Sequence, residues 1–196
     1  MITRADLKKA LPDITSTLKF PGLLAPVEIL RDAWGIPHVR AQNTHDAFFG
    51  QAFAAAQDRL WHMDYDRHRA HGRWAEFVGK PGLDNDLLMR RFRLDASARD
   101  DYAFIASDAR AMLDAYAEGV NAFIQTTETL PVEYQIVGQT PEPWQPWDSL
   151  AVLKVRHILM GTFEGKLWRA RLLRKLGLKK TAALHPGYQP GHLQVL

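Results

Sequence analysis

Residues 50–63 read GQAFAAAQDRLWHM, and most apolar side chains around this stretch recur every three or four positions. That spacing places them on one face of a helix. The pattern starts near Thr44, whose hydroxyl can cap a helix, and Asp46, whose charge suits a first helical turn. It persists to about Arg69. The sequence therefore predicts one long helix that turns its apolar face toward the core.

Histidines and aspartates gather at the end of this predicted helix. His62 and Asp66 are four residues apart, and His68 and His71 are three apart, so each pair shares a helix face. A metal site needs three or four convergent ligands, whereas these two pairs point to different sides of a straight helix. We therefore predict that they form hydrogen bonds and ion pairs with neighbouring elements.

The rest of the chain is predicted to be mostly helical, with a few strands near its start. Residues 27–32 and 38–41 read as strands around a turn that contains Gly35, which predicts a β-hairpin. Further helices are expected from Ser107, from an Asp148 cap, and over a basic segment, 166–176, that stops at Gly177. Residues 81–99 read as a charged loop. The fold class is α+β, but two strands are too few for a stable sheet. They need partners from elsewhere.

Composition sets broad limits on the protein. Its 196 residues are 46% hydrophobic and 24% charged, as in an ordinary globular domain, and none is a cysteine. No apolar run approaches the roughly 18 residues of a membrane span, so we expect no membrane partner. The N-terminus lacks the apolar segment of a signal peptide. The expected compartment is the cytoplasm, or the periplasm if a signal has been removed.

Catalytic motifs are missing from the sequence. The serines are Ser16, Ser97, Ser107 and Ser149, and none lies in a Gly-x-Ser-x-Gly turn. Ser107 and Ser149 read as residues at helix starts. Neither a Walker loop nor a dinucleotide-binding fingerprint is present, so no organic cofactor is expected. From the residues alone, the chain offers scaffold and surface without a complete catalytic constellation.

The C-terminal part is basic. The last acidic residue is Glu164, and the cations that follow it are Lys166, Arg169, Arg171, Arg174, Lys175, Lys179 and Lys180. One interpretation is a helical binding module for nucleic acid or for an acidic protein. The other is a solvated helix face, or a basic surface that meets an acidic partner chain. Base-stacking aromatics are missing apart from Trp168, which favours the second interpretation and predicts no nucleic-acid partner.

Several segments together resemble the penicillin acylase family. They are VEILRDAWGIPHVRA at 27–41, GQAFAAAQDRLWHM at 50–63, YAEGVNAFI at 116–124 and TPEPW at 140–144. Each segment alone is a modest match, but their order and spacing together make the resemblance specific. The match covers about residues 26–177.

The resemblance implies the fold and the partner. Members of this family cut a precursor into a small α chain and a larger β chain, which form the αββα four-layer sandwich of N-terminal-nucleophile hydrolases. The nucleophile is the first residue of the β chain, usually Ser. This chain resembles the α chain, so no catalytic residue is expected in it. The implied division is a lead-in at 1–25, an α chain at 26–184 that shares one domain with the β chain, and an irregular tail at 185–196.

The resemblance also implies a role for one helix in substrate binding. The helix after the Trp-x-Pro connector lines the acyl pocket in the family, which makes His157, Met160 and Phe163 the candidate contacts for a small N-acyl substrate. Some members bind a structural Ca²⁺ through one α-chain Glu and several β-chain oxygens. Glu164 is the nearest acidic residue to that position. The implied activity is hydrolysis of a linear amide in a penicillin, cephalosporin, acyl-homoserine lactone or N-acyl amino acid. Higher oligomers of the αβ unit are compatible with it.

Overall fold

The computed structural model describes residues 2–161 and 163–186, without the side chain of Leu159. It separates into two compact units, residues 1–156 and residues 157–196. We describe each unit by itself. Most of the predicted irregular tail, from residue 187 onward, lies outside the described residues.

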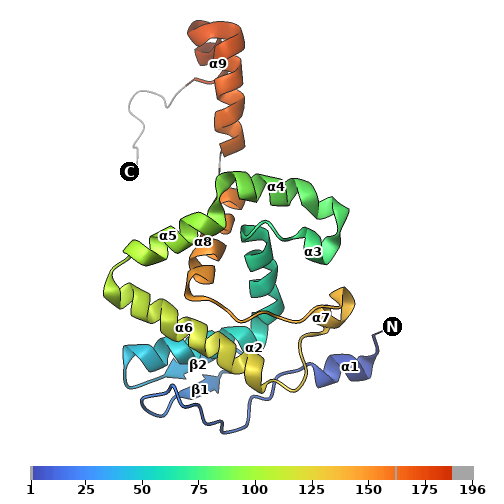
Figure 1. Ribbon diagram of the computed structural model, residues 1–196, viewed down its shortest axis with the longest axis vertical. Coiled ribbons are helices and arrows are strands. Elements are labelled where there is room, and N and C mark those ends of the chain that lie inside the picture. The colour runs from blue at the N-terminus through green and yellow to red at the C-terminus, as the bar shows by residue number, and fades with distance from the viewer. Residues whose placement is uncertain (1, 162, 187–196) are drawn as a thin grey trace. The chain divides into compact units, whose positions relative to one another are not determined.

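Helices dominate both units, and a single hairpin of two antiparallel strands lies near the start of the first (Figure 1). This confirms the mostly helical prediction. The elements in chain order are α1 (Arg4–Lys9), β1 (Glu28–Arg31), β2 (Pro37–Arg40), α2 (Thr44–Ala70), α3 (Ala75–Val78), a 3-10 turn (Lys80–Gly82), α4 (Leu83–Phe92), α5 (Leu94–Phe104), α6 (Ser107–Thr126), α7 (Val132–Val137), α8 (Pro146–Met160) and α9 (Phe163–Leu184).

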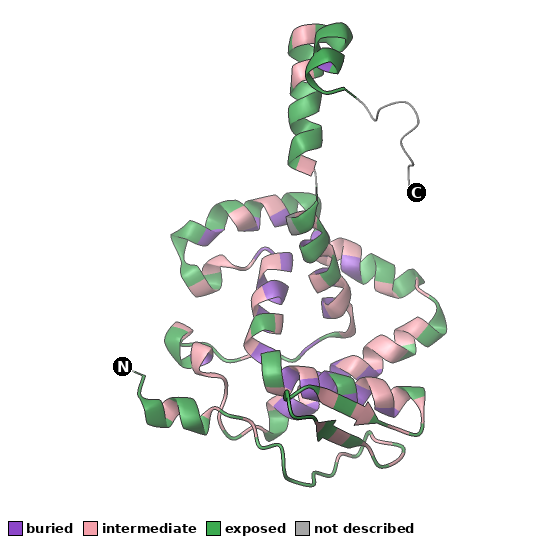
Figure 2. Ribbon diagram, turned by 180° about the vertical axis from the view of Figure 1, so that it is seen from behind, coloured by how far each residue is buried: buried purple, intermediate pink, exposed green. Residues whose placement is uncertain are grey.

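Helix α2 packs along α6 to form the core of the first unit. Residues on the facing sides are buried, as the purple segments of both helices show (Figure 2). The two backbones come unusually close at Gly119, where an added Cβ would lie 2.2 Å from the carbonyl oxygen of Phe49. The predicted helix is confirmed over residues 44–70, but it is kinked at Arg59, whose φ of −143° and ψ of 18° are not helical. Its N-cap, however, is Asn43, whose side chain accepts from the Asp46 amide, and Thr44 is the first helical residue.

The hairpin packs on α2 through small and branched side chains. Ile29 pairs with Val39 in the antiparallel register, and a Cβ at Gly50 of α2 would lie 2.8 Å from both Val27 Cγ1 and Val39 Cγ1. Glycine therefore allows the close approach. On the other side of the hairpin, Leu30 is 45% exposed.

Residues 83–104 form two helices, so the prediction of a loop over 81–99 was wrong. The segment buries Met89, Leu94 and Ala98, and polar contacts tie α4 to the turn at residues 72–75. The Asp86 carboxylate accepts from the amides of Trp74 and Ala75 at 2.7 and 2.8 Å, and Arg90 donates to the carbonyl of Gly72 at 2.9 Å. Such tertiary contacts leave no periodic signature in the sequence.

Other element boundaries also differ from the predictions. The lead-in contains α1, and Thr3 and Asp6 form a capping box at the N-terminus of this helix. Helix α8 begins at Pro146, and Asp148 lies in its first turn, where its Oδ2 accepts from the Gln145 amide at 2.8 Å. Helix α9 has the predicted break at Gly177, whose φ is 76°, but helical structure resumes beyond it.

Asp46 ties the lead-in to the start of α2. Its side chain is fully buried and accepts from the amides of Leu24 and Ala25 at 3.0 and 2.8 Å, and from Asn43 Nδ2 at 2.6 Å. Burial raises the pKa of this carboxyl, but these hydrogen bonds and one from His45 outweigh it, so that the pKa falls to about 2. The charged form is therefore part of the folded state.

We expect Asp46→Asn to destabilise the protein by roughly 1–3 kcal/mol, because it removes charge-assisted hydrogen bonds from a buried site. A carboxyl with a lowered pKa stabilises the fold above its unfolded pKa, and this contribution is lost as pH falls through the folded pKa. The difference in unfolding free energy between wild type and Asp46→Asn should thus be constant above about pH 5 and shrink toward pH 2. Urea unfolding at a series of pH values measures it. A difference that stays constant down to pH 2 would contradict this account.

Candidate functional site

A buried ion-pair network links α2 to α8. Arg67, 4% exposed, donates from Nε and Nη2 to Asp64 Oδ1 at 2.9 and 2.6 Å, and its Nη1 lies 3.3 Å from Asp148 Oδ2. Asp64 and Asp148 are each 1% exposed. Two buried carboxylates thus share one guanidinium, which offsets much of the cost of burying their charge.

The same arginine holds the proline-rich connector that precedes α8. Its guanidinium donates to the carbonyls of Glu142 and Pro143, both at 3.1 Å. The Glu142 side chain is bound in turn by both terminal nitrogens of Arg73 at 2.8 Å. This contact is the main cause that lowers the pKa of Glu142 to about 2. The connector is therefore held to α2 through its backbone, and to the turn that follows α2 through the Glu142 side chain.

Asp64 collects further partners. Tyr134 donates its hydroxyl to Asp64 Oδ2 at 2.9 Å, and His68 Nδ1 lies 3.0 Å from Oδ1. Burial raises the pKa of Asp64, but the hydrogen bond with His68 and the charge of Arg67 outweigh it and lower the pKa overall. Burial also raises the pKa of Tyr134, with the Asp64 charge adding to the effect. The network therefore contains an ionised carboxylate and a neutral phenol.

The predicted ion pairs of the histidine and aspartate cluster are confirmed. His62 and Asp66 share a helix face and meet the same residue: Arg156 donates from Nε to Asp66 Oδ2 at 2.7 Å, and its Nη2 lies 3.0 Å from His62 Nε2. His71 Nε2 lies 3.1 Å from Asp148 Oδ1. Within residues 2–161 and 163–186, no group of three or more His, Asp or Glu side chains is placed to hold a metal ion.

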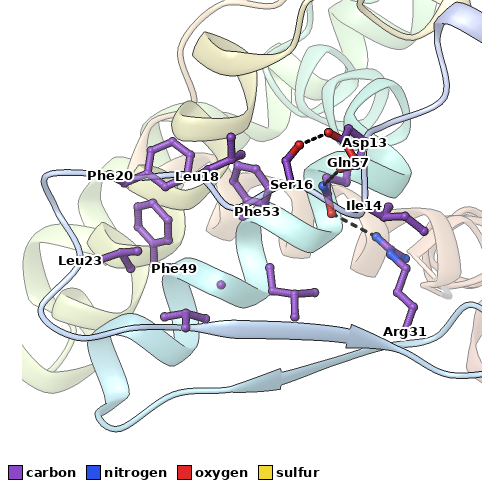
Figure 3. Close-up of a pocket in the computed structure, with 13 residues that line it drawn as sticks. Asp13, Ile14, Ser16, Leu18, Phe20, Leu23, Arg31, Phe49, Phe53 and Gln57 are labelled. Atoms are coloured by element: carbon purple, nitrogen blue, oxygen red, sulfur yellow. Dashed lines mark hydrogen bonds between the residues drawn. The ribbon is translucent and has the colours of Figure 1, made fainter.

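A small cavity lies between the lead-in, β1 and α2 (Figure 3). Its volume is ≈ 140 Å³, and its apolar wall includes Phe20, which packs against Phe49 and Phe53 at centroid distances of 5.6 and 5.5 Å. On the polar side, Ser16 donates to Asp13. No histidine lines this cavity, so Ser16 has no imidazole base there.

Of the other serines, two make structural contacts and one begins a helix. Ser97 accepts from Lys154 Nζ at 2.9 Å, Ser149 accepts from the Trp144 indole at 3.2 Å, and Ser107 is the first residue of α6. In the part of the chain that the structure describes, no serine hydroxyl is bonded to a histidine. The described residues therefore contain no activated serine of the Ser–His type.

The residues predicted to contact substrate lie in the second unit, on both sides of the break at Gly161. His157 and Met160 are in the last turn of α8, where both are exposed, and Phe163 and Glu164 begin α9. Phe163 is partly buried and Glu164 is exposed. None of the four lines the cavity of Figure 3. Proximity along the chain brings them together.

Sequence reasoning missed the network around Arg67. Asp64 and Arg67 are three apart on one helix, which is a readable signal. Asp148 and Tyr134 are far away in sequence, and no local pattern joins them to α2.

None of the helices described is long and apolar enough to cross a bilayer.

Comparison with known proteins assigns the class to which this chain belongs. The profile of the penicillin amidase family matches residues 26–191, most of the chain. The chain therefore belongs to the penicillin amidase family.

Individual relatives agree with this assignment. The chain is 43% identical, over 174 residues, to the penicillin acylase 2 proenzyme of Pseudomonas sp. (strain SE83), a match that covers 89% of this chain and 22% of that protein. It is 32% identical to the acyl-homoserine lactone acylase QuiP of Pseudomonas syringae pv. tomato, over 89% of this chain and 21% of that protein. The chain thus spans about a fifth of the length of these curated relatives.

A solved structure matches at nearly full length. It is the thermostable penicillin G acylase from Alcaligenes faecalis in its tetragonal form, with a TM-score of 0.68 and 26% identity. The match covers 87% of this chain and 97% of the matched chain. The two chains are therefore of similar length and share a fold.

Proposed function

We propose that this chain is the smaller chain of a self-processed, two-chain acylase that hydrolyses a linear amide bond of an N-acyl compound. The candidate substrates are penicillins, cephalosporins, acyl-homoserine lactones or N-acyl amino acids, from which the acyl group is removed. The nucleophile in this proposal is the N-terminal Ser of the larger chain. The proposed enzyme uses no organic cofactor, and the proposal is compatible with higher oligomers of the two-chain unit.

One comparison of lengths carries the proposal. The curated relatives are several times longer than this chain, and one of them is named a proenzyme. The matched chain of the solved penicillin G acylase is nevertheless about as short as this one. A precursor that yields separate chains accounts for both observations.

The serine contacts are consistent with a nucleophile outside these residues. Ser16, Ser97 and Ser149 bond to Asp13, Lys154 and Trp144. A chain-terminal amine has an ordinary pKa of about 8, so a useful fraction is free base at neutral pH. It can take the proton of its own hydroxyl as the oxygen attacks the amide carbon, without a histidine. Donors that stabilise the resulting oxyanion would also lie in the larger chain.

The hairpin of β1 and β2 supports a shared domain. A two-stranded sheet is marginal by itself, and the exposed Leu30 lies on the side of the hairpin away from α2. We propose that strands of the larger chain continue this sheet and cover that face, which would complete an αββα four-layer sandwich.

We propose that His157, Met160 and Phe163 face the acyl group in the two-chain enzyme. Met160 is 77% exposed and His157 is exposed, so both are free to be covered by another chain or by substrate. An imidazole at this place suits an acyl group that ends in a carboxylate. The substrate class would then be a dicarboxylic acyl amide.

His157→Leu should raise KM about tenfold for acyl groups that end in a carboxylate, and leave KM for apolar acyl groups unchanged or lower, because it removes one charge-assisted contact. Steady-state kinetics of the two-chain enzyme on paired substrates measures this selectivity. His185→Leu, the same change at another exposed histidine, is the matched control. Equal selectivity in wild type and His157→Leu would contradict the assignment.

A structural Ca²⁺ is the one metal in the proposal. Glu164 fits it as a single ligand, because its carboxylate is exposed and makes no ion pair among the described residues. Ca²⁺ takes six to eight oxygens, so the others would come from the larger chain. Metal analysis of wild type and Glu164→Gln would show whether bound Ca²⁺ depends on this residue.

The proposal is tested by expressing the full reading frame that contains this chain. We expect two copurifying polypeptides, the shorter one containing residues 26–184, and hydrolysis of at least one compound from an N-acyl amide panel. A single uncut polypeptide without amidase activity would contradict the proposal.

A further inference from the structure

Helix α8 is tied to α2 by ion pairs at two places. Near its start, Asp148 Oδ2 lies 3.3 Å from Nη1 of Arg67. Further along, Arg156 donates from Nε to Asp66 Oδ2 at 2.7 Å, and its Nη2 lies 2.5 Å from the same oxygen. The two ties are about 12 Å apart along the helix, at a rise of about 1.5 Å per residue. They therefore fix the direction of residues 148–156 along α2.

Asp66 holds Arg156 through a buried charge. The Asp66 side chain is 4% exposed, and Arg156 is its one cationic partner in the part of the chain that the structure describes. The other carboxylate oxygen, Oδ1, is buried and has no hydrogen-bond partner among those residues. A buried carboxylate that loses its cation is strongly destabilising. The fold therefore resists any movement that takes Arg156 away from Asp66.

His62 adds a second acceptor to the same guanidinium. Its Nε2 lies 3.0 Å from Arg156 Nη2, and a guanidinium can only donate hydrogen bonds. The His62 ring therefore accepts at Nε2 and carries its proton on Nδ1. His62 and Asp66 lie on successive turns of one face of α2. Two acceptors one turn apart fix the orientation of the Arg156 guanidinium as well as its distance from α2.

The residue that follows Arg156 is His157, the proposed contact for an acyl group that ends in a carboxylate. Helix α8 is continuous from Pro146 to Met160, so Arg156 and His157 are successive residues of one helix. A helical residue follows its predecessor by a rotation of about 100° and a rise of about 1.5 Å. A shift or rotation of the Arg156 backbone therefore changes the position of the His157 backbone directly.

We infer that Arg156 is a positioning residue for recognition of the acyl group, and that Asp66 and His62 hold it in place. Arg156 acts through His157 and makes no contact with substrate. Displacement of a group in the site by about 1 Å can cost about a hundredfold in rate, so a tie at the preceding residue affects selectivity. The inference rests on the proposed acyl contact of His157 and deepens it.

A purely structural role for these contacts predicts a different result. Loss of stability alone lowers the amount of active enzyme and affects all substrates alike. Loss of the His157 position removes binding of one class of acyl group, so it raises KM for that class and leaves kcat unchanged. Paired substrates therefore separate the two roles.

The test uses the two-chain enzyme and a pair of N-acyl amides whose acyl groups end in a carboxylate or in a methyl group. The untied variant carries Asp66→Asn and Arg156→Met together, so that no charge stays buried without its partner. Arg156→Lys is the conservative variant, because it keeps a cation beside Asp66. Arg31→Met is the matched control, since Arg31 also pairs with an aspartate of α2, Asp58, at 2.9 Å.

We expect the untied variant to raise KM for the carboxylate-ended amide about tenfold, and to change kcat and the KM of the methyl-ended amide by less than about twofold. Arg156→Lys should recover part of the loss. Arg31→Met should show the selectivity of wild type. An equal rise of KM for both amides, or wild-type selectivity in the untied variant, would overturn the inference.

A double-mutant comparison shows whether Arg156 acts through His157. In a His157→Leu enzyme, the two untying substitutions should change the ratio of the two KM values by less than about twofold. A further shift of about tenfold in that background would mean that Arg156 contacts the acyl group itself, which overturns the positioning role. An unchanged ratio in His157→Leu alone would overturn the proposed acyl contact and this inference with it. An altered ratio in His157→Leu but not in the untied variant would overturn this inference alone.

Discussion

Arg67→Met should lower the free energy of unfolding by roughly 3–5 kcal/mol. The substitution keeps an unbranched apolar stem in place of the arginine stem but leaves Asp64 and Asp148 buried without their cation. It also removes the donors to the connector carbonyls of Glu142 and Pro143. Urea unfolding followed by circular dichroism measures the loss.

The matched control is Arg91→Met on α4. Arg91 is exposed and makes no ion pair among the described residues, so this change should alter stability by about 0.5 kcal/mol or less. If both variants lost the same small amount of stability, Arg67 would not hold α2 and α8 together as described.

Gly119→Ala should destabilise the core by about 3 kcal/mol. The new methyl would lie 2.2 Å from the Phe49 carbonyl oxygen and 2.8 Å from Ala52 Cβ, so α2 and α6 would have to separate. Backbone atoms cannot yield as the end of a side chain can. Thermal unfolding should show a lower Tm and a less cooperative transition.

Gly165→Ala provides the opposite case. Gly165 lies in the first turn of α9, and a Cβ there would meet nothing within 4 Å. Alanine should therefore be neutral or stabilise that helix by up to about 1 kcal/mol. Equal destabilisation by the two substitutions would argue against the close approach of α2 and α6.

Residues 44–70 were predictable because one physical cause determines them. Apolar side chains that pack against a neighbour must recur with the helical period, and they do so from Phe48 to Met63. The hairpin was predictable for a similar reason, since a glycine turn separates two short β-prone segments. Both segments also carry the family resemblance.

Residues 83–104 could not be predicted in the same way. The first of their two helices, α4, is tied down by Asp86 and Arg90, which bond to backbone groups of Gly72, Trp74 and Ala75. A sequence shows these residues only as charges in a polar region. The backbone groups that bind these two side chains are identified only in the three-dimensional structure.

Prediction of the candidate site from the sequence was limited in another way. The Arg67 network joins residues 64, 67, 134 and 148. Pairings between distant residues carry no local signature in the sequence.

The central claim is that this chain shapes an acylase whose nucleophile lies in another chain. Covalent labelling tests it most directly: the active two-chain enzyme is inactivated with a sulfonyl fluoride, and the modified residue is located by mass spectrometry. We predict one label per enzyme, on the first residue of the larger chain, and an unmodified shorter chain. Stoichiometric label on Ser16, Ser97, Ser107 or Ser149, with parallel loss of amide hydrolysis, would contradict the claim.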